Sequence, residues 1–399
     1  MTDHDPKSEG ARHGPSSVLL HDALAGPGET RSHLFDDLRA VITCRRGVDI
    51  ARAMADAEAA LDDGLHLAGA VAYELGHHLE PRLAGLARDG ATLFQFGAFA
   101  RHRTLTGPEA DAVLAARVRR SGTRPSVTAF ERGESAAGYR AKLARLRDYI
   151  LDGDIYQANF TFPLSFPWAG DPWSLYARLA PNQRVAYGAV VDLPDCRLAC
   201  LSPELFFSKQ GPLIEARPMK GTSRRGATPC EDAALARALR ADPKNRAENL
   251  MILDLIRNDI GRMARIGSVA VPRAFEIETF GTLHQMTSTV TGTIDPGLSL
   301  LAILGHLFPC GSVTGAPKIR AMEIIAELEE GPRGFYTGAL GYVTPGRDMC
   351  FNVPIRTVEL TGAGMARMGV GSGVVFDSGA DDEYAECLLK SRFLEMGLA

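Results

Sequence analysis

One lysine stands where a strand candidate meets a turn that contains glycine. Lys220 ends the segment PLIEARPMK and is followed directly by Gly221 and Thr222. A lysine at the mouth of a cleft becomes a nucleophile when burial or neighbouring cations lower its pKa. Nearby arginines could supply that positive field or bind an anion: Arg217, Arg224 and Arg225. An exposed lysine at a strand end is the alternative, and this segment alone leaves both open.

A glycine-rich turn, GSVTGAPK, leads into a helix predicted over 317–328. It contains Ser312, Gly315 and Ala316, and free backbone N–H groups at such a helix start bind anions. The pattern is not a phosphate-binding loop of the Walker type, because an alanine and a proline separate Gly315 from Lys318. A carboxylate therefore suits the turn as well as a phosphate. A plain helix entry remains the alternative.

Two predicted helices carry carboxylates in unusual settings. Glu248 shares a helix face with apolar residues, which is costly unless the carboxylate is paired or binds a metal. Near the C-terminus, Glu383 and Glu386 lie one turn apart, with Lys390 one turn further. Carboxylates from two helices could hold Mg²⁺ with positions left open for a substrate. The alternative is surface charge, since Glu386 and Lys390 have the spacing of a helical ion pair.

Four further residues are candidates for chemistry. Glu204 stands beside apolar residues in SPELFF, where a raised pKa would make it a general acid. His284 is a lone histidine, which is usually just hydrogen-bonded. Arg356 falls inside a predicted strand and needs an anionic partner. Gly373 belongs to GVGSGVVF, whose glycines indicate a bulge or close backbone approach to a ligand.

The elements that must position these residues predict an α+β fold. Many strand candidates occur without regular alternation with helices, which favours large mixed or antiparallel sheets flanked by helices. One helix should begin after Ser135, with apolar residues at helical spacing from Tyr139 to Ile150. Others are predicted near 50–61, 232–263 and 381–394. The segment IYQANFTFPLSF alternates, which predicts a strand with one wet face formed by Gln157, Asn159, Thr161 and Ser165.

Composition limits the classes of function. The chain has 399 residues, 45% of them hydrophobic and 23% charged, with a net charge of −4. These values are typical of a soluble globular protein and give no reason to expect nucleic-acid binding. No apolar stretch is long enough to cross a membrane. Seven scattered cysteines without a C-x-x-C motif predict reduced thiols and a cytoplasmic location. We expect a disordered tail (1–16), an N-terminal part of the fold (17–130) and a catalytic region (131–399).

In their order along the chain, these motifs closely resemble the chorismate-utilising synthases. That group includes anthranilate synthase component I, aminodeoxychorismate synthase component I, and the isochorismate and salicylate synthases. The resemblance covers about residues 153–393 and rests on a run of ten segments: YQANF, SPELFF, RPMKGT, AENLMILDLIRND, TFGTLHQM, GSVTGAPK, GFYTGALGYV, IRT, GVGSGVVFDS and EYAECLLKS. It implies a sandwich of two subdomains around a central cleft, with chorismate and Mg²⁺ as ligands.

The resemblance also implies a role for each candidate. Glu248 and Glu386 resemble the metal ligands, with Glu383 close by. Glu204 resembles the group that assists departure of the ring hydroxyl, with His284 near it. The remaining positions resemble the substrate contacts, which are a clamp on the side-chain carboxylate and a floor under the ring: Tyr336, Arg356, Gly373 and Lys390, and Gly221, Thr222, Ser312, Gly315 and Ala316.

Two positions distinguish the subfamilies. The isochorismate and salicylate types have a lysine general base where this chain has Gln157. The anthranilate type usually has alanine where this chain has Lys220, and lysine there is typical of aminodeoxychorismate synthases. The resemblance therefore implies that Lys220 attacks the ring and displaces a hydroxyl, and that ammonia then displaces the lysine. Ammonia is expected from a separate glutamine amidotransferase subunit, in a heterodimer.

The other interpretations of the sequence rank below this one. Anthranilate synthase component I is the main alternative, and an isochorismate or salicylate synthase or a non-catalytic chorismate-binding relative comes after it. A nucleotide hydrolase built on GSVTGAPK is disfavoured by the lack of a GK[ST] motif. The sequence leaves open whether the product feeds folate or a secondary metabolite.

Overall fold

The computed structural model describes residues 16–26, 28–121, 130–279, 283–362 and 364–398, and all statements below concern these residues. Their strands form one large sheet of 18 strands, and every recorded strand pairing is antiparallel. The predicted α+β class is confirmed, with antiparallel rather than mixed pairing. The predicted tail falls outside the described residues except for its last position.

The strands, in chain order, are β1 Ser17–His21, β2 Ser32–Cys44, β3 His66–Val71, β4 Phe94–Leu105, β5 Glu131–Arg132, β6 Gln157–Pro167, β7 Tyr187–Leu193, β8 Cys196–Ser202, β9 Leu205–Gln210, β10 Leu213–Arg217, β11 Met219–Arg224, β12 Ala270–Thr279, β13 Leu283–Thr293, β14 Gly315–Ala316, β15 Ala339–Val343, β16 Met349–Asn352, β17 Thr357–Gly362 and β18 Met365–Val374. The α-helices are α1 Ile50–Asp62, α2 Leu75–Leu79, α3 Gly107–Ser121, α4 Ala136–Leu151, α5 Pro172–Leu179, α6 Pro229–Ala241, α7 Pro243–Gly261, α8 Leu300–Leu307, α9 Lys318–Leu328 and α10 Ala380–Leu398.

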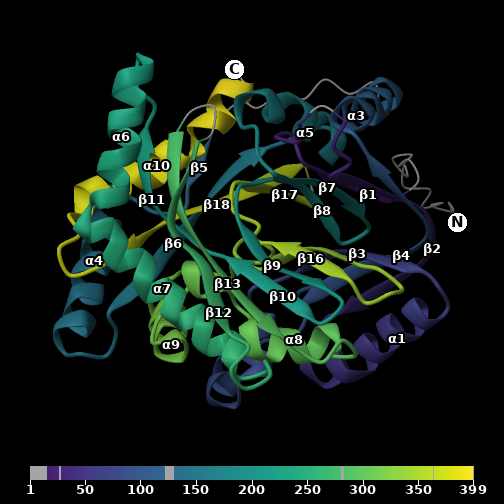
Figure 1. Cartoon of the computed structure of the whole chain (residues 1–399), viewed down its shortest axis with the longest axis horizontal. Helices are drawn as coiled ribbons and strands as arrows, with labels where there is room; N and C mark the ends of the chain where they lie inside the picture. Colours follow the sequence, from purple (N-terminus) through teal and green to yellow (C-terminus); the bar gives the residue numbers. More distant parts are fainter. Residues whose placement is uncertain (1–15, 27, 122–129, 280–282, 363, 399) are drawn as a thin grey trace, which may run out of the picture.

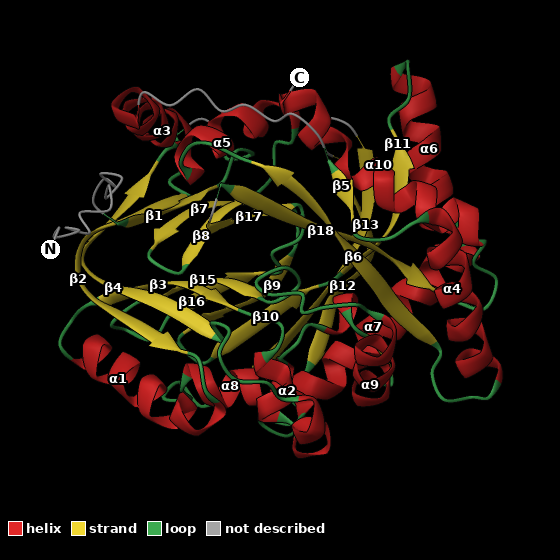
Figure 2. Ribbon diagram, turned by 180° about the vertical axis from the view of Figure 1, so that it is seen from behind, coloured by secondary structure: helices red, strands yellow, loops and turns green. Residues whose placement is uncertain are grey.

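The sheet folds over on itself into two layers, which Figure 2 shows edge-on. One layer holds β1, β7, β8 and β17, and the other holds β2, β4, β3, β15, β16, β9 and β10. Helices α3 and α5 cover the outside of the first layer, and α1, α2 and α8 cover the second. The helices α6, α7 and α10 gather at the opposite end from the N-terminus, beside β6, β11 and β18 (Figure 1).

Strands from both predicted parts of the chain share this sheet. β1 pairs with β7, and β3 pairs with β15, so early and late segments build the same layers. The buried apolar residues accordingly form large clusters that draw on the whole chain. The segment 122–129, inside the predicted boundary, lies outside the described residues. The division into two parts therefore remains a prediction about organisation, within one continuous sheet.

Helix α4 follows its predicted pattern. The Ser135 hydroxyl accepts a hydrogen bond from the Gly138 backbone N–H at 3.0 Å, which satisfies a free donor at the helix start. Tyr139, Leu143 and Leu146 are buried against the core. The predicted single helix over 232–263 is instead two, α6 and α7, because Asp242 and the proline after it end one helix and cap the next.

The polar face of β6 was predicted to be wet, and most of it is buried. Gln157, Asn159 and Thr161 all lie in the interior, where the turn before α9 and a buried ion pair cover them. The apolar alternation also fails at its start, because Tyr156 is 68% exposed. A buried polar face with few apolar partners indicates a site rather than a solvated surface.

None of the described helices is both long and apolar enough to span a membrane. All seven cysteines lie in the described part of the chain, and none forms a disulfide.

Candidate active site

Lys220 is aimed by an irregularity in its strand. It was predicted at the end of one strand, but Pro218 divides that segment into β10 and β11 and Lys220 is the second residue of β11. The pairing of β11 with β13 slips by one residue between Met219 and Thr222, which is a β-bulge. Bulges redirect side chains and are frequent beside active sites. Gly221 within the bulge has φ +86°, a conformation that favours glycine.

The amine of Lys220 reaches the glycine-bearing strand β18. A methyl group built on Gly373 would lie 3.0 Å from Lys220 Nζ, 2.5 Å from Gln157 Nε2 and 3.2 Å from Asn159 Oδ1. Glycine at position 373 therefore leaves the space in which these groups converge. Among the described residues, Lys220 has no recorded hydrogen bond, and both polar atoms of the Gln157 side chain, which is 0% exposed, lack a partner.

The charge state of Lys220 is shifted in the direction that a nucleophile needs. Burial lowers the pKa of the amine, and the positive charge of Lys390 lowers it further. The carboxylates of Glu248, Glu204 and Glu386 oppose this and raise it. The three predicted arginines do not supply the field: Arg217 pairs with Glu278, Arg224 with Glu231, and Arg225 with Asp232. Burial is therefore the dominant cause, as for other buried lysines.

Glu204 lies in the tight connection between β8 and β9 and is only 3% exposed. Burial raises its pKa to about 7, against the opposing effects of a hydrogen bond from Ser312 and the charge of Lys220. The Ser312 hydroxyl donates to Glu204 Oε1 at 2.6 Å. The carboxyl group thus exchanges its proton near neutral pH, beside the amine of Lys220. This combination suits a general acid that protonates a leaving group.

Arg356 was predicted inside a strand, but it lies in the connection between β16 and β17 with φ +51°. The backbone turns there because Val353 and Arg356 bond across to β8 and its following turn rather than continuing the ladder of β16. Burial lowers the pKa of the guanidinium to about 10, against the opposing charge of Glu204. No carboxylate of the described residues lies within 4.0 Å of it, so Arg356 is available to an anionic ligand.

The three predicted metal ligands come together only in part. Burial raises the pKa of Glu248 against the positive charges of Lys220 and Lys244, and the charges of Glu383 and Glu386 act in the same direction as burial. Glu386 pairs with Lys390 at 2.7 Å, and Glu383 accepts a hydrogen bond from Ser378 at 2.7 Å. Glu248 forms no recorded ion pair with any of the described residues. The described residues contain no cluster of three ready-made metal ligands. One or two carboxylates with substrate oxygens still fit Mg²⁺.

The turn before α9 is built against β6. Gly315 and Ala316 form β14, which pairs with Ala158 and Gln157. The backbone carbonyl of Ser312 accepts from the Asn159 amide at 3.0 Å, so this turn forms one wall beside Gln157 and Gly373. Helix α9 begins at Lys318, one residue later than predicted. The Lys318 amine forms a buried ion pair with Asp259 at 2.5 Å, so it does not serve a phosphate in the turn.

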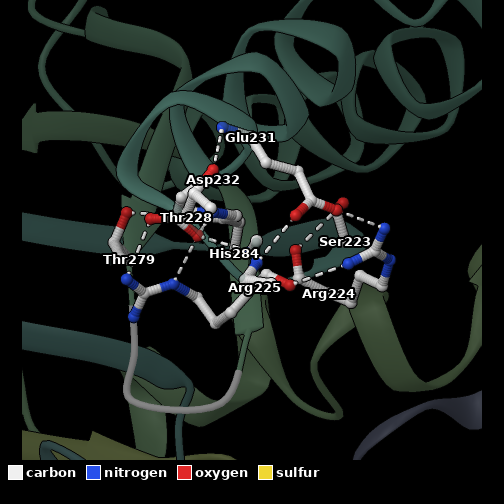
Figure 3. A network of polar contacts seen from close by, with 10 residues as sticks. Ser223, Arg224, Arg225, Thr228, Glu231, Asp232, Thr279 and His284 are labelled. Carbon is white, nitrogen blue, oxygen red and sulfur yellow. Dashed lines mark hydrogen bonds and ion pairs between the residues drawn. The ribbon is translucent and has the colours of Figure 1, made fainter.

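His284 is held in a network at the edge of this region, which Figure 3 shows. Its Nε2 lies 2.9 Å from Asp232 Oδ1, and its Nδ1 lies 2.9 Å from Thr279 Oγ1. Asp232 in turn accepts hydrogen bonds from Arg225 at 2.7 Å and 2.8 Å. No recorded contact among the described residues joins His284 to Glu204, so its predicted place near that carboxyl stays a prediction. The ring therefore links α6 to β13. Strand β13 in turn pairs with β11, the strand that carries Lys220.

Three of the predicted substrate contacts, Tyr336, Thr222 and Lys390, lie in three different surroundings. The ring of Tyr336 packs over Gly369, and both residues line a cavity of about 210 Å³ whose lining does not include Lys220. Gly369 precedes Gly373 by four residues on β18, about 13 Å along an extended strand. No recorded contact among the described residues joins Tyr336 to Gly373. Thr222 is exposed on β11, whereas Lys390 donates to the Gly371 carbonyl at 2.9 Å.

Gln157 was expected on a solvated strand face, at a position without a lysine base, and Asn159 was not among the predicted site residues. The structure places both beside Lys220 and Gly373. The signal was present in the alternation of YQANF, whose polar residues were assigned to solvent. Reading the same face as buried would have placed two carboxamides in the site.

Comparisons with known proteins agree with this arrangement of motifs. The family model described as chorismate binding enzyme matches residues 25–396. Aminodeoxychorismate synthase component 1 of Bacillus subtilis is 41% identical over 261 residues, covering 65% of this chain and 55% of the relative. The protein of the same name from Salmonella typhimurium is 39% identical over 287 residues, covering 72% and 61%. Anthranilate synthase component 1 of Methanothermobacter thermautotrophicus is 39% identical over 253 residues, covering 63% and 54%. The matches thus span somewhat more than half the length of these relatives.

Solved structures share the fold at lower identity. Anthranilate synthase component I from Streptococcus pneumoniae has a TM-score of 0.72 and 24% identity, covering 98% of this chain and 94% of that one. The menaquinone-specific isochorismate synthase from Escherichia coli has a TM-score of 0.71 and 15% identity, covering 96% and 89%. At these identities the likeness concerns the fold alone. Because the family model matches nearly the whole chain, the protein belongs to the family of chorismate binding enzymes.

Proposed function

We propose that this chain is the synthase component of aminodeoxychorismate formation, which converts chorismate and ammonia to 4-amino-4-deoxychorismate. The observation that carries the proposal is the Lys220 amine, which has a lowered pKa, has no recorded hydrogen bond to described residues, and points at Gly373 between the Gln157 and Asn159 carboxamides. Relatives named aminodeoxychorismate synthase component 1 support the same substrate.

In this proposal the neutral Lys220 amine forms a bond to a ring carbon of chorismate. The ring hydroxyl leaves as water with a proton donated by Glu204, and the proton lost from the amine returns to the Glu204 carboxylate. Ammonia then forms the new C–N bond at the 4-position, and one of its protons passes to the lysine nitrogen, which leaves as a free amine. Splitting the substitution into two steps is what a covalent nucleophile contributes.

The surrounding residues bind and orient the substrate. Arg356, which has no carboxylate partner among the described residues, binds a carboxylate of chorismate. Glu248 and Glu386 would hold Mg²⁺, with Glu383 beside them, and a metal bound there would supply positive charge for the second substrate carboxylate. Gln157 offers an amide and no base, so the site lacks the lysine that would activate water.

Ammonia is supplied by a glutamine amidotransferase in the proposed assembly. The relatives' names contain the words component 1, which imply a second component. We expect the isolated chain to accept ammonium directly at high concentration.

The test is the identity of the product formed from chorismate, Mg²⁺ and ammonium, measured by mass spectrometry and NMR. The expected product is 4-amino-4-deoxychorismate without pyruvate. Anthranilate with equimolar pyruvate would overturn the proposal in favour of the anthranilate reaction. Lys209→Met is a control for Lys220→Met: Lys209 is a buried lysine whose amine donates to the Arg347 carbonyl at 2.9 Å. Only Lys220→Met should stop amination.

A further inference from the structure

A thiol lies behind the candidate acid. The Cys310 Sγ is 3.2 Å from the Ser312 hydroxyl, and that hydroxyl is 2.6 Å from Glu204 Oε1. All three residues are buried, with exposures of 1%, 4% and 3%. They therefore form a linear chain of polar groups that starts in the apolar core and ends at the carboxyl group.

When Glu204 is ionised, the available protons decide which group donates in each hydrogen bond between Cys310, Ser312 and Glu204. A serine hydroxyl has one proton, and Ser312 gives it to the carboxylate because a carboxylate only accepts. The oxygen of Ser312 must then accept from the thiol, which is its only other recorded side-chain partner among the described residues. When Glu204 is protonated, the direction reverses: the carboxyl donates to Ser312, and Ser312 turns its proton to the sulfur.

The thiol remains protonated throughout. Burial raises the pKa of Cys310 to about 12, and the charge of Glu204 raises it as well. Cys310 therefore acts as a fixed S–H donor at neutral pH rather than as a competing anion. S–H groups are weak donors, but hydrogen bonds in a chain polarise one another inside a protein.

Other groups also act on Glu204, and each approaches from a different element. Lys220 of β11 and Arg356 of the β16–β17 connection contribute positive charge, and the Met219 backbone also lowers the pKa of the carboxyl. All three favour the ionised form, as Ser312 does. Of these groups, only the Ser312 hydroxyl can rotate away from the carboxylate, so only its contact depends on a neighbour that orients it. The positions of the charged groups and of the Met219 backbone are fixed by the fold.

We propose that Cys310 is a positioning residue for Glu204: its thiol holds the Ser312 hydroxyl on the carboxylate and so sets the pH at which the acid gives up its proton. This rests on the proposed function, in which Glu204 protonates the leaving hydroxyl. Removal of the thiol frees the hydroxyl to rotate, weakens the ionised form, and leaves Glu204 protonated up to a higher pH.

The experiment compares pH profiles of kcat/KM for chorismate at a constant concentration of free ammonia. The wild-type profile should fall as pH rises through about 7, because a general acid must carry its proton. Cys310→Ala should move this falling limb upward by about 0.5 pH unit, which is a threefold change in the protonation ratio. Cys310→Ser keeps a donor and should leave the limb in place or lower it. Cys196→Ala, which removes another fully buried thiol on β8, is the control and should not move it.

A second comparison isolates the route through Ser312. In a Ser312→Ala background, Cys310→Ala should cause no further shift, because the chain is already broken. Three results would overturn the proposal: an unmoved limb in Cys310→Ala, an equal upward shift in Cys310→Ser, or an undiminished shift in the Ser312→Ala background. Thermal unfolding of each variant separates a shifted profile from a loss of folded protein.

A failure of the proposed function can be distinguished from a failure of the positioning role of Cys310. If wild-type protein does not aminate chorismate, the activity assignment fails, whatever the thiol does. The carboxyl C=O stretch of Glu204, assigned by its absence in Glu204→Gln, can still be titrated by infrared difference spectroscopy. An upward shift of that titration in Cys310→Ala, but not in Cys310→Ser, would support the positioning role, and coincident titrations would refute it.

Discussion

Replacing Glu204 with glutamine should stabilise the fold at alkaline pH, at the expense of activity. The carboxyl is 3% exposed, and burial raises its pKa from the ordinary value of 4.5 to about 7. A raised carboxyl pKa means that the folded state holds its proton more tightly than the unfolded state. The resulting stability is present at low pH and is lost as pH rises from about 4.5 to 7.

The magnitude follows from the two pKa values. Linkage gives a loss of about 1 kcal/mol at pH 5 and about 3 kcal/mol at pH 8, relative to an unshifted group. The wild-type free energy of unfolding should therefore fall by about 2 kcal/mol more than that of Glu204→Gln between these pH values. Other titrating groups are common to both proteins and cancel in the difference.

Urea unfolding of wild type and Glu204→Gln at pH 5, 6, 7 and 8 measures this difference directly. The Ser312 hydrogen bond remains possible in the variant, because the glutamine amide oxygen accepts it. Parallel pH dependences of the two proteins would refute the argument that burial holds this carboxyl near neutrality. A difference that opens in the acid range instead would mean that Glu204 is stabilised as a carboxylate.

Three further expectations concern single features of the site. Gly373→Ala places a methyl 3.0 Å from the Lys220 amine and should lower kcat/KM about 10²-fold. The control is Gly85→Ala, where nothing lies within 4 Å and kcat/KM should not change; equal effects of the two substitutions would contradict this expectation. Chelation of Mg²⁺ should abolish turnover, and a rate unchanged by chelator would exclude a role for the metal. Glu386→Gln should raise the Mg²⁺ concentration for half-maximal rate about tenfold or more. His284→Ala should lower the free energy of unfolding by about 1–3 kcal/mol in urea, because both ring nitrogens are bonded. An inactive variant of wild-type stability would instead favour acid–base work by His284.

The sequence predicted the fold class, helix α4 and its cap, because periodicity and capping are local signals. It also selected Lys220 and Glu204, which the structure places in mutual electrostatic contact although 16 residues of bent chain separate them. Their identification depended on motif order rather than on any single pattern, since a lone lysine or glutamate has many uses.

The failures share a physical cause, which is tertiary contact. The polar face of β6 looked solvated because alternation does not reveal what covers a face, and here the 311–316 turn covers it. The bulge at Lys220 and the left-handed turn at Arg356 depend on pairing partners that are distant in sequence. Likewise, the network that engages His284 joins β12, β13 and α6, and no local pattern predicts it.

Peptide mass spectrometry of Lys220, after incubation with chorismate and Mg²⁺ in the absence of ammonia, asks whether the amine becomes bonded to the ring. We expect an adduct on this residue with the mass of chorismate less one water, which disappears when ammonium is added. The contrary result is amination of chorismate at the wild-type rate by Lys220→Met, with no adduct on the wild-type lysine.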